Sequence, residues 1–158
     1  MKIDPYLTAI LYGDGSVSLR KDGAYAIWID QAEINRDIMV NEVIPRLRHL
    51  GSKVYVYRYY AKKDKTYKFR ALIYSKQVYK SLKFIFNSID TYLNELSNYE
   101  ARTFIAGLMD AEGTVTDRIV IYNSNRKLLE AVRNKLIQMG FEYVYILQVW
   151  SNLRSPDL

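Results

Sequence analysis

Apolar residues recur at helical spacing in five stretches of the chain. The spacing predicts helices over Ile3–Gly13, Ile34–Leu50, Ser75–Asn87, Glu100–Ala111 and Asn125–Met139. The second of these is amphipathic, with an apolar side formed by Ile34, Ile38, Leu47 and Leu50. Pro45 lies inside it and should kink or split the helix, because proline removes a backbone hydrogen bond. Gly51 and Gly140 should end the second and the last helix.

Between the helices, apolar and polar residues alternate with period two, which predicts strands. The strands form hairpins over 16–31 and 53–73, a shorter pair at Thr114–Thr116 and Arg118–Asn123, and a last strand at Phe141–Trp150. The second hairpin turns at Ala61–Thr66 and should have one apolar face and one face of Tyr, Lys and Arg. Leu93–Tyr99 has the composition of a polar joint, after which the order of elements begins again. The pattern predicts an α+β chain with antiparallel sheets.

Composition narrows the class of protein. With 158 residues, of which 49% are apolar, the chain suits a globular fold rather than a disordered one. The absence of cysteine excludes a disulfide-stapled domain, a thiolate metal site and a thiol nucleophile. No apolar run approaches the roughly 18 residues of a membrane span, and no signal peptide is apparent. We therefore expect a cytoplasmic protein, with an organellar location not excluded, that has no membrane partner.

The net charge of +6 is concentrated in one part of the chain. Residues 1–98 hold 16 Lys and Arg against 10 Asp and Glu, whereas residues 99–158 hold 7 of each. Ten bases and a single acid, Asp64, lie between Lys53 and Lys83, interleaved with tyrosines. Two interpretations are open. The hairpin has either a solvated outer face whose edge lysines block aggregation, or a groove in which Tyr, Lys and Arg contact nucleic acid.

An internal repeat relates the two halves. Tyr6–Val17 aligns with Phe104–Val115 at a constant offset of 98 residues. Each copy has two small residues four apart, Ala9 and Gly13 in the first copy and Gly107 and Ala111 in the second. On a helix this spacing makes a flat stripe, so two such helices can pack backbone to backbone.

Each copy then ends in a carboxylate followed by glycine, Asp14–Gly15 and Glu112–Gly113. We expect the glycine to be a helix C-cap. An acid at the C-terminus of a helix is disfavoured by about 0.3–1 kcal/mol, and packed helices would bring the two acids together. A divalent cation removes both penalties, because carboxylates and carbonyls at helix ends are good ligands for it. The alternative is an acid at a helix end that simply points into water.

These residues resemble the LAGLIDADG homing endonucleases. Ile105–Gly113 is close to the nine-residue family motif, and Leu7–Gly15 is a looser copy with Tyr12 where the family often has Asp. The resemblance implies a duplicated αββαββα repeat with pseudo-twofold symmetry and saddle-shaped antiparallel sheets, with the helices on the outer face. It divides the chain into a complete, basic first repeat, 1–98, and a shorter second repeat, 99–158.

The resemblance also implies a site. Asp14 and Glu112 would bind Mg²⁺, or Mn²⁺, with Ca²⁺ in a non-cleaving complex, and the carbonyls of Gly13 and Ala111 could also contact the metal. Asp110 would be structural. Gln31 and Asn123, at the ends of second strands, would order the metal-bound waters, unless each simply begins the following helix turn. The family's active-site lysines have no clear match in this sequence.

The implied function is site-specific cleavage of double-stranded DNA, leaving short 3′ overhangs, by a monomer with a long near-palindromic or asymmetric target. The outward-facing strand and turn residues would bind DNA: Ser18, Arg20, Trp28, Asp30, Tyr55, Tyr57, Tyr59, Lys62, Lys63, Lys65, Lys68, Arg70, Arg118 and Tyr122. Further candidates are Ala26, Thr116, Tyr143, Tyr145 and Gln148.

Two alternatives remain at this point. Asp110–Val115 also resembles the signature of haloacid-dehalogenase-type phosphatases, with Asp110 as nucleophile, although that family would leave the repeat unexplained. A relative with the same fold could instead bind nucleic acid without cutting it, either as an RNA-splicing maturase or as a DNA-binding protein. The acid retained in both copies favours cleavage.

Overall fold

A computed structural model describes residues 1–147 of the chain. The first half contains α1 (Pro5–Gly13), β1 (Gly15–Leu19), β2 (Tyr25–Ala32), η1 (Glu33–Asn35), α2 (Arg36–Ile38), η2 (Met39–Val43), α3 (Ile44–His49), β3 (Tyr55–Ala61), β4 (Thr66–Tyr74), α4 (Lys76–Asn87) and α5 (Ile89–Glu95). The second half contains α6 (Asn98–Glu112), β5 (Gly113–Val115), β6 (Ile119–Ile121) and α7 (Arg126–Gln138).

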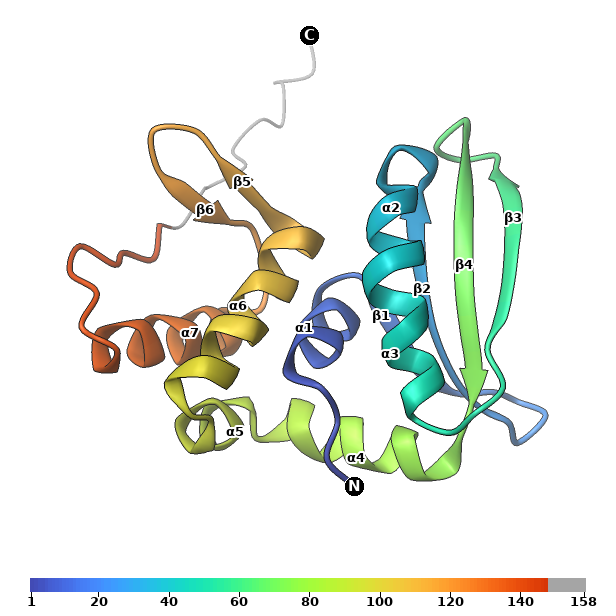
Figure 1. The fold of residues 1–158 in the computed structure, drawn as a ribbon, viewed down its shortest axis with the longest axis horizontal. Coiled ribbons are helices and arrows are strands. Elements are labelled where there is room, and N and C mark those ends of the chain that lie inside the picture. The colour runs from blue at the N-terminus through green and yellow to red at the C-terminus, as the bar shows by residue number, and fades with distance from the viewer. Residues whose placement is uncertain (148–158) are drawn as a thin grey trace, which may run out of the picture.

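The strands form two antiparallel sheets on opposite sides of a central helix pair. The larger sheet has the strand order β1-β2-β4-β3, and the smaller one pairs β5 with β6. Helices α1 and α6 lie side by side at the centre (Figure 1), and α1 packs together with α3 against the larger sheet. Helix α7 and the β5–β6 hairpin lie on the far side of α6. This arrangement confirms the predicted α+β class with antiparallel sheets and a restart of the element order at α6.

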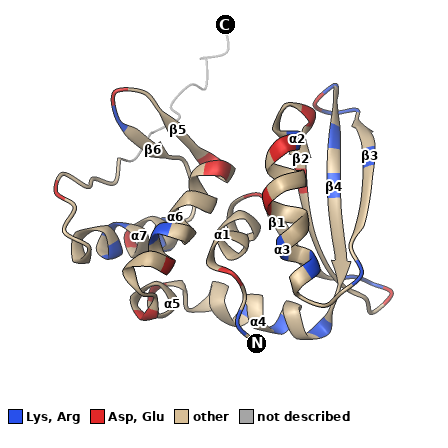
Figure 2. Ribbon diagram, viewed as in Figure 1, with Lys and Arg blue, Asp and Glu red and all other residues tan. Residues whose placement is uncertain are grey.

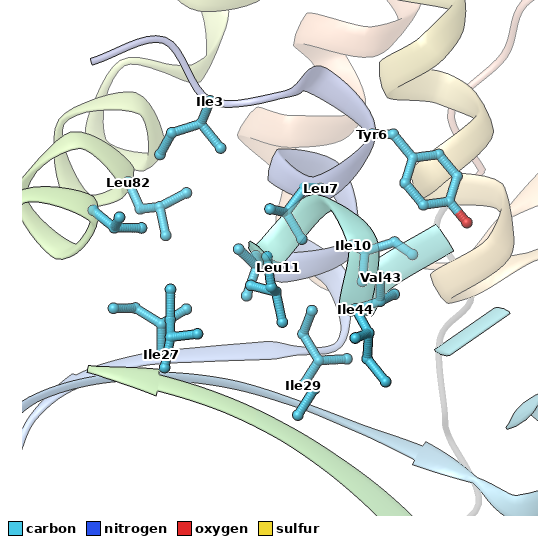
Figure 3. Close-up of a cluster of buried hydrophobic side chains, with 14 of the residues drawn as sticks. Ile3, Tyr6, Leu7, Ile10, Leu11, Ile27, Ile29, Val43, Ile44 and Leu82 are labelled. Atoms are coloured by element: carbon cyan, nitrogen blue, oxygen red, sulfur yellow. The ribbon is translucent and has the colours of Figure 1, made fainter. Parts of the chain in front are cut away.

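One hydrophobic core joins α1 to the larger sheet. Leu7, Ile10 and Leu11 of α1 point toward Ile27 and Ile29 of β2, and all five side chains are buried (Figure 3). Proline in the first turn and Asp4, whose carboxylate accepts a hydrogen bond from the Leu7 backbone N–H at 3.0 Å, define the start of α1. The core fixes α1 against the inner face of the sheet. Because successive residues of a strand point to opposite faces, the residues that alternate with Ile27 and Ile29 face outward.

A second core lies on the other side of the central pair. Phe104 and Leu108 of α6 pack there with Leu128 of α7 and with Ile89 and Leu93 of α5. Helix α6 begins with a capping box in which Ser97 and Glu100 each accept a hydrogen bond from the other's backbone N–H. The predicted domain boundary between residues 98 and 99 lies one residue inside this helix and stays a prediction.

Small residues set the close approach of α1 and α6. A Cβ built on Gly107 would stand 2.4 Å from the carbonyl oxygen of Tyr6, and one built on Gly13 would stand 3.0 Å from the Cβ of Ala111. Neither position has room for a larger side chain without a shift of its neighbours. The stripes of Ala9 and Gly13 and of Gly107 and Ala111 therefore face each other, as the repeat predicted.

The predicted helix over Ile34–Leu50 is broken into short segments. A π-helical stretch at Met39–Val43 precedes α3, which has Pro45 in its first turn, so the missing proline N–H is tolerated there. The apolar side was wrong in one place: Ile34 is 91% exposed. The change of pitch before Pro45 turns the inward face to Met39, Val43 and Leu47, which are buried.

Two other predicted segments differ. Leu93–Tyr99 is not a polar joint, because the end of α5 and the start of α6 occupy the region and Leu93 and Leu96 are buried. Residues 141–147 form no strand, and Tyr143 has a φ of +57°, which is incompatible with regular extended structure. The rest of the predicted last strand, 148–150, lies outside the described residues.

The expected glycine C-cap is confirmed at Gly113, whose N–H donates to the Met109 carbonyl at the end of α6, and is wrong for α1, whose C-cap is Asp14. Gly15 and Gly113 are the first residues of β1 and β5, and Gly113 has an extended backbone with φ −95° and ψ 161°. Glycine is needed at both positions because a side chain would not fit. A Cβ would stand 2.5 Å from the Leu11 Cα at Gly15 and 2.5 Å from the Met109 methyl carbon at Gly113. In each half, the chain thus turns directly from a central helix into a strand.

Within residues 1–147, no helix is long and apolar enough to cross a membrane.

Candidate active site

Asp14 lies where α1 passes into β1. Its backbone N–H donates to the Ile10 carbonyl at 2.9 Å, which closes the last turn of the helix. Its carboxylate accepts a hydrogen bond from Gln31 Nε2 at 2.8 Å, and Gln31 Oε1 in turn accepts one from Asn35 Nδ2 at 3.0 Å. Gln31 is buried at the end of β2. A chain of two amides therefore holds the carboxylate in place.

Glu112 occupies the matching place at the end of α6. Its carboxylate accepts a hydrogen bond from Asn123 Nδ2, and the Asn125 backbone N–H donates to Asn123 Oδ1 at 2.6 Å. The Tyr122 N–H donates to the Glu112 carbonyl at 3.1 Å. The two halves thus repeat one device: an acid at the helix end, and an amide after the second strand that orients it. Gln31 and Asn123 do not follow the 98-residue offset, yet the fold places them in equivalent roles.

The two acids have raised pKa values. Burial among surrounding protein atoms raises the pKa of Asp14, although its side chain remains accessible to solvent, while the Gln31 hydrogen bond and the charge of Lys68 lower it. Burial also raises the pKa of Glu112; the Asn123 hydrogen bond opposes this, and the negative charge of Asp14 adds to it. The acids are therefore near enough to repel each other, which is the condition that a bound cation relieves.

The oxygen donors at this site suit a hard divalent cation that takes some of its ligands from the protein and the others from water and a substrate. The last carbonyls of each helix, including those of Gly13 and Ala111, have no partner within the helix. A Cβ on Gly13 would stand 3.2 Å from the Glu112 Cδ, which places this glycine against the second acid. Among the described residues, no group of three or more His, Cys, Asp or Glu side chains could hold a metal. Mg²⁺ is commonly bound by one or two carboxylates plus waters and substrate phosphates.

Asp110 has a different environment from Glu112. Its carboxylate accepts a hydrogen bond from the Tyr6 hydroxyl at 2.6 Å, across the α1–α6 interface. Tyr6 points away from the sheet toward α6 (Figure 3), and burial followed by the Asp110 hydrogen bond raises its pKa. Asp110 is therefore used in helix packing. Its partner in the repeat, Tyr12, accepts a hydrogen bond from Asn125 Nδ2 at 2.8 Å.

The face of the larger sheet opposite its helices, which is its outer face in the structure, gathers the predicted DNA contacts of the first half. Ile27, Ile29, Ala71 and Ile73 face the core, so the alternate positions face outward. The register joins β1, β2, β4 and β3 across this face. It brings together Ser18, Trp28, Asp30, Lys68, Arg70, Tyr55, Tyr57 and Tyr59, and Arg20 reaches it by donating to the Tyr74 hydroxyl at 3.2 Å. Ala26 has the same strand parity but is only 1% exposed, so the prediction that it contacts DNA is wrong. Figure 2 shows bases along β4.

The predicted division of the hairpin into two faces holds for β4 but not for β3. Val56, on the inner side of β3, is 45% exposed. Strand β3 is the edge of the sheet, and α2 and α3 do not cover it (Figure 1). Lys62, Lys63 and Lys65 are exposed at the β3–β4 turn.

The candidates in the second half are spread out. Arg118 is exposed beside Asp117, to which its Nη2 donates at 3.0 Å, and Thr116 Oγ1 donates to the same carboxylate at 2.9 Å. Tyr122 follows β6 and is exposed. Tyr143 and Tyr145 are exposed beyond α7 and outside any sheet, and Gln148 lies outside the described residues. No continuous outer sheet face joins these side chains within residues 99–147.

Sequence reasoning missed the residues that orient the two amides. Asn35 and Asn125 each lie just beyond Gln31 or Asn123 and bind its side-chain oxygen. An Asn at the start of a helix is ordinarily interpreted as an N-cap, so the sequence held no separate sign that these residues orient Gln31 and Asn123. Lys68 was predicted only as a DNA contact. Its charge also acts on Asp14, and it forms an ion pair with Asp64 in the turn.

Comparison with known proteins identifies the architecture. The sequence matches no protein-family model and no curated protein. The structure is similar to solved structures of the homing endonuclease I-DmoI, including a complex with DNA and Ca that is 23% identical at a TM-score of 0.67 and covers 87% of this chain and 71% of that one. A complex with DNA and Mn, and a variant of I-DmoI with its target DNA in the presence of Mg, are similar at the same TM-score and identity, covering 77% and 76% of their own chains. The chain therefore has the LAGLIDADG fold of I-DmoI.

Proposed function

We propose that this protein is a site-specific, divalent-metal-dependent endonuclease that cuts both strands of a double-stranded DNA target. The observation that carries the proposal is the pair of acids, Asp14 and Glu112, each at the end of a central helix and each oriented by an amide. One such acid would be an ordinary helix end. Two, related by the internal repeat and close enough to interact, suit the two strands of one duplex.

The fold supports the same reaction. The similar structures of I-DmoI contain DNA together with Ca, Mn or Mg. The alternative phosphatase is disfavoured, because its nucleophile would be Asp110, which instead binds the Tyr6 hydroxyl in the helix interface. It would also leave Glu112 and Asp14 without a shared purpose.

Asp14 and Glu112 would hold the metal through the carboxylate oxygens that Gln31 and Asn123 leave free. When bound, Mg²⁺ lowers the pKa of a coordinated water and neutralises the leaving 3′ oxygen. Gln31 and Asn123 keep the carboxylates directed at the site, and the second N–H of each amide group could donate to a water there. Lys68 adds positive charge on the Asp14 side. Cutting both strands in this arrangement would leave short 3′ overhangs.

The outer face of the larger sheet would bind the duplex. It combines aromatic rings with Lys and Arg, which contact phosphates and base edges. Both acids belong to one chain, so a single copy can address both strands, and we propose a monomer. The target would be asymmetric, because the second half offers a smaller sheet and no net charge.

The test begins by selecting the target. A library of randomised duplexes is enriched for binding with Ca²⁺, and the enriched duplex, placed in a plasmid, is then incubated with Mg²⁺. We expect the parent protein to linearise the plasmid, and the Asp14→Asn and Glu112→Gln variants to bind it without linearising it. Enrichment of a motif by a parent that never cuts with Mg²⁺ or Mn²⁺ would overturn the nuclease. Tight, specific binding to structured RNA without cleavage would favour a maturase.

A further inference from the structure

One ion pair on the outer sheet face fixes an arginine side chain more firmly than electrostatic attraction to DNA phosphates would require. Asp30 of β2 and Arg70 of β4 are direct cross-strand neighbours. Arg70 Nε donates to Asp30 Oδ1 at 2.7 Å, and Arg70 Nη2 donates to Asp30 Oδ2 at 2.6 Å. The side chains are 28% exposed for Arg70 and 24% exposed for Asp30. The contact is a two-pronged ion pair that fixes the plane of the guanidinium group.

Aromatic side chains enclose the same guanidinium group. Its central carbon lies 5.3 Å from the ring centroid of Trp28 and 5.2 Å from that of Tyr59. Nη1 lies 3.5 Å from the hydroxyl of Tyr57, the neighbour of Arg70 on the other strand. The four neighbours hold a long side chain in one orientation, so little conformational entropy is left to lose when it binds a ligand.

The ion pair occupies only one edge of Arg70. A guanidinium group has five N–H donors, and Asp30 accepts from Nε and from one of the two on Nη2. The second edge, formed by Nη1 and the other Nη2 hydrogen, has no carboxylate partner among residues 1–147. Two parallel donors of this kind match the O6 and N7 acceptors that guanine presents in the major groove.

Asp30 makes little sense as a DNA contact in its own right. Both of its carboxylate oxygens accept a hydrogen bond from Arg70, so its charge is directed at that guanidinium group and not at a cytosine amino group. A negative charge also repels the phosphate backbone. Its place on this face is explained if it aims a neighbouring side chain at a base.

We infer that Arg70 reads a guanine in the major groove through its Nη1–Nη2 edge, and that Asp30 is the positioning residue that aims it. This inference rests on the proposed binding of double-stranded DNA and adds a base preference to it. Trp28 and Tyr59 hold the guanidinium plane between them. An arginine directed at a phosphate would need no such frame, because phosphate contacts tolerate many orientations and carry no sequence information.

The experiment is a binding selection from randomised duplexes with Ca²⁺, sequenced for the parent and for Arg70→Gln, Arg70→Lys, Asp30→Asn and Arg58→Gln. Arg58 is the matched control. It is an arginine of the same hairpin on the opposite strand parity, ion-paired with Glu33 at 3.0 Å and stacked on Tyr67. Circular dichroism and thermal unfolding of each variant establish that it is folded.

We expect one G·C position of the parent motif to lose about tenfold or more of its discrimination in Arg70→Gln. Arg70→Lys should lose it too while keeping the charge and the salt dependence of binding. Asp30→Asn should relax the same position without weakening total binding, since it removes a negative charge. Arg58→Gln should leave the motif unchanged.

Other outcomes separate the inference from the function on which it rests. If Arg70→Gln weakens binding equally for all duplexes and leaves the motif intact, Arg70 contacts phosphate and the inference is wrong. If only Asp30→Asn leaves the position unchanged, the positioning role is wrong. A parent protein that enriches no motif at all contradicts the proposed function itself.

Discussion

The carboxylates of Asp14 and Glu112 end the two central helices close enough together that the charge of Asp14 raises the pKa of Glu112. The approach depends on the small residues of α1 and α6, and the orientation depends on Gln31 and Asn123. The fold thus maintains a repulsion that a metal would remove. Such an arrangement lowers the stability of the free protein and is expected at a functional site rather than in a purely structural contact.

The first prediction concerns stability and pH. A raised carboxyl pKa means that the folded state favours the protonated form, so the stabilisation is present below the ordinary pKa and is lost as pH rises through the raised one. Without metal, Glu112→Gln and Asp14→Asn should therefore raise the thermal midpoint at pH 7, and the gain should shrink toward pH 4. The gain will be modest, because water screens the accessible Asp14.

Glu100 provides the opposite control. Its pKa is lowered to about 2, first by Lys2 and then by the Ser97 cap. Its stabilisation is present above its ordinary pKa of 4.5 and is lost as pH falls through about 2. Glu100→Gln should lower the thermal midpoint at pH 7 and have little effect near pH 2. Equal signs for Glu100→Gln and Glu112→Gln at pH 7 would contradict the assigned environments.

The second prediction concerns the amides. Gln31→Ala and Asn123→Ala each free one acid from its hydrogen bond, so each should slow cleavage by roughly tenfold or more while DNA binding is kept. Because each amide serves one acid, nicked plasmid should accumulate before linear product forms. Strand-specific end labelling measures which strand is cut first. The two variants should favour opposite strands; identical strand preference would show that the amides do not act locally.

The third prediction concerns the helix interface. On an open helix, Gly→Ala stabilises by about 1 kcal/mol. At Gly107 the new Cβ would meet the Tyr6 carbonyl oxygen at 2.4 Å, and such overpacking costs about 1–3 kcal/mol. Gly107→Ala should therefore lower the thermal midpoint, whereas Ala106→Leu, at an exposed position on the same helix, should change it little. A stabilised Gly107→Ala would mean that α1 and α6 are farther apart.

The fourth prediction concerns the charges of the β3–β4 turn. Changing Lys62, Lys63 and Lys65 to Gln should reduce the salt dependence of DNA binding, by about 0.9 in the slope of log K against log salt for each phosphate that the protein no longer neutralises. The matched control changes Lys76, Lys80 and Lys83 to Gln. Helix α4 lies at the opposite end of α1 and α6 from Asp14 and Glu112 (Figure 1), so the slope should stay the same. An equal reduction of the slope in both variants would indicate nonspecific attraction.

Local and repeated patterns made the fold readable from the sequence. Period-two alternation placed the hairpins, and the 98-residue offset paired Asp14 with Glu112 before any contact was known. What failed depends on tertiary packing. The polar residues around Leu93 and Leu96 give this stretch the local composition of a loop, yet both leucines are buried in the second core. The 3₁₀ turn that holds the exposed Ile34, and the π-helical stretch before Pro45, likewise depart from the regular helix that the local pattern predicted.

The site shows the same division. The acids could be predicted because their sequence context is repeated. Gln31 and Asn123 break the offset and could be placed only through the resemblance, since their position depends on where each second strand ends. The supporting Asn35 and Asn125, and the influence of Lys68 on Asp14, depend on the three-dimensional arrangement. Pairings between distant strands, such as Asp30 with Arg70, follow from register alone.

The most direct test of the central claim is to sequence the ends of DNA cut with Mg²⁺ at the selected site. We predict one break in each strand, offset to leave short 3′ overhangs, and loss of both breaks in the combined Asp14→Asn and Glu112→Gln variant that still binds the duplex. Cleavage by that variant at the parent rate, or ends scattered without a fixed site, would contradict the two-acid nuclease.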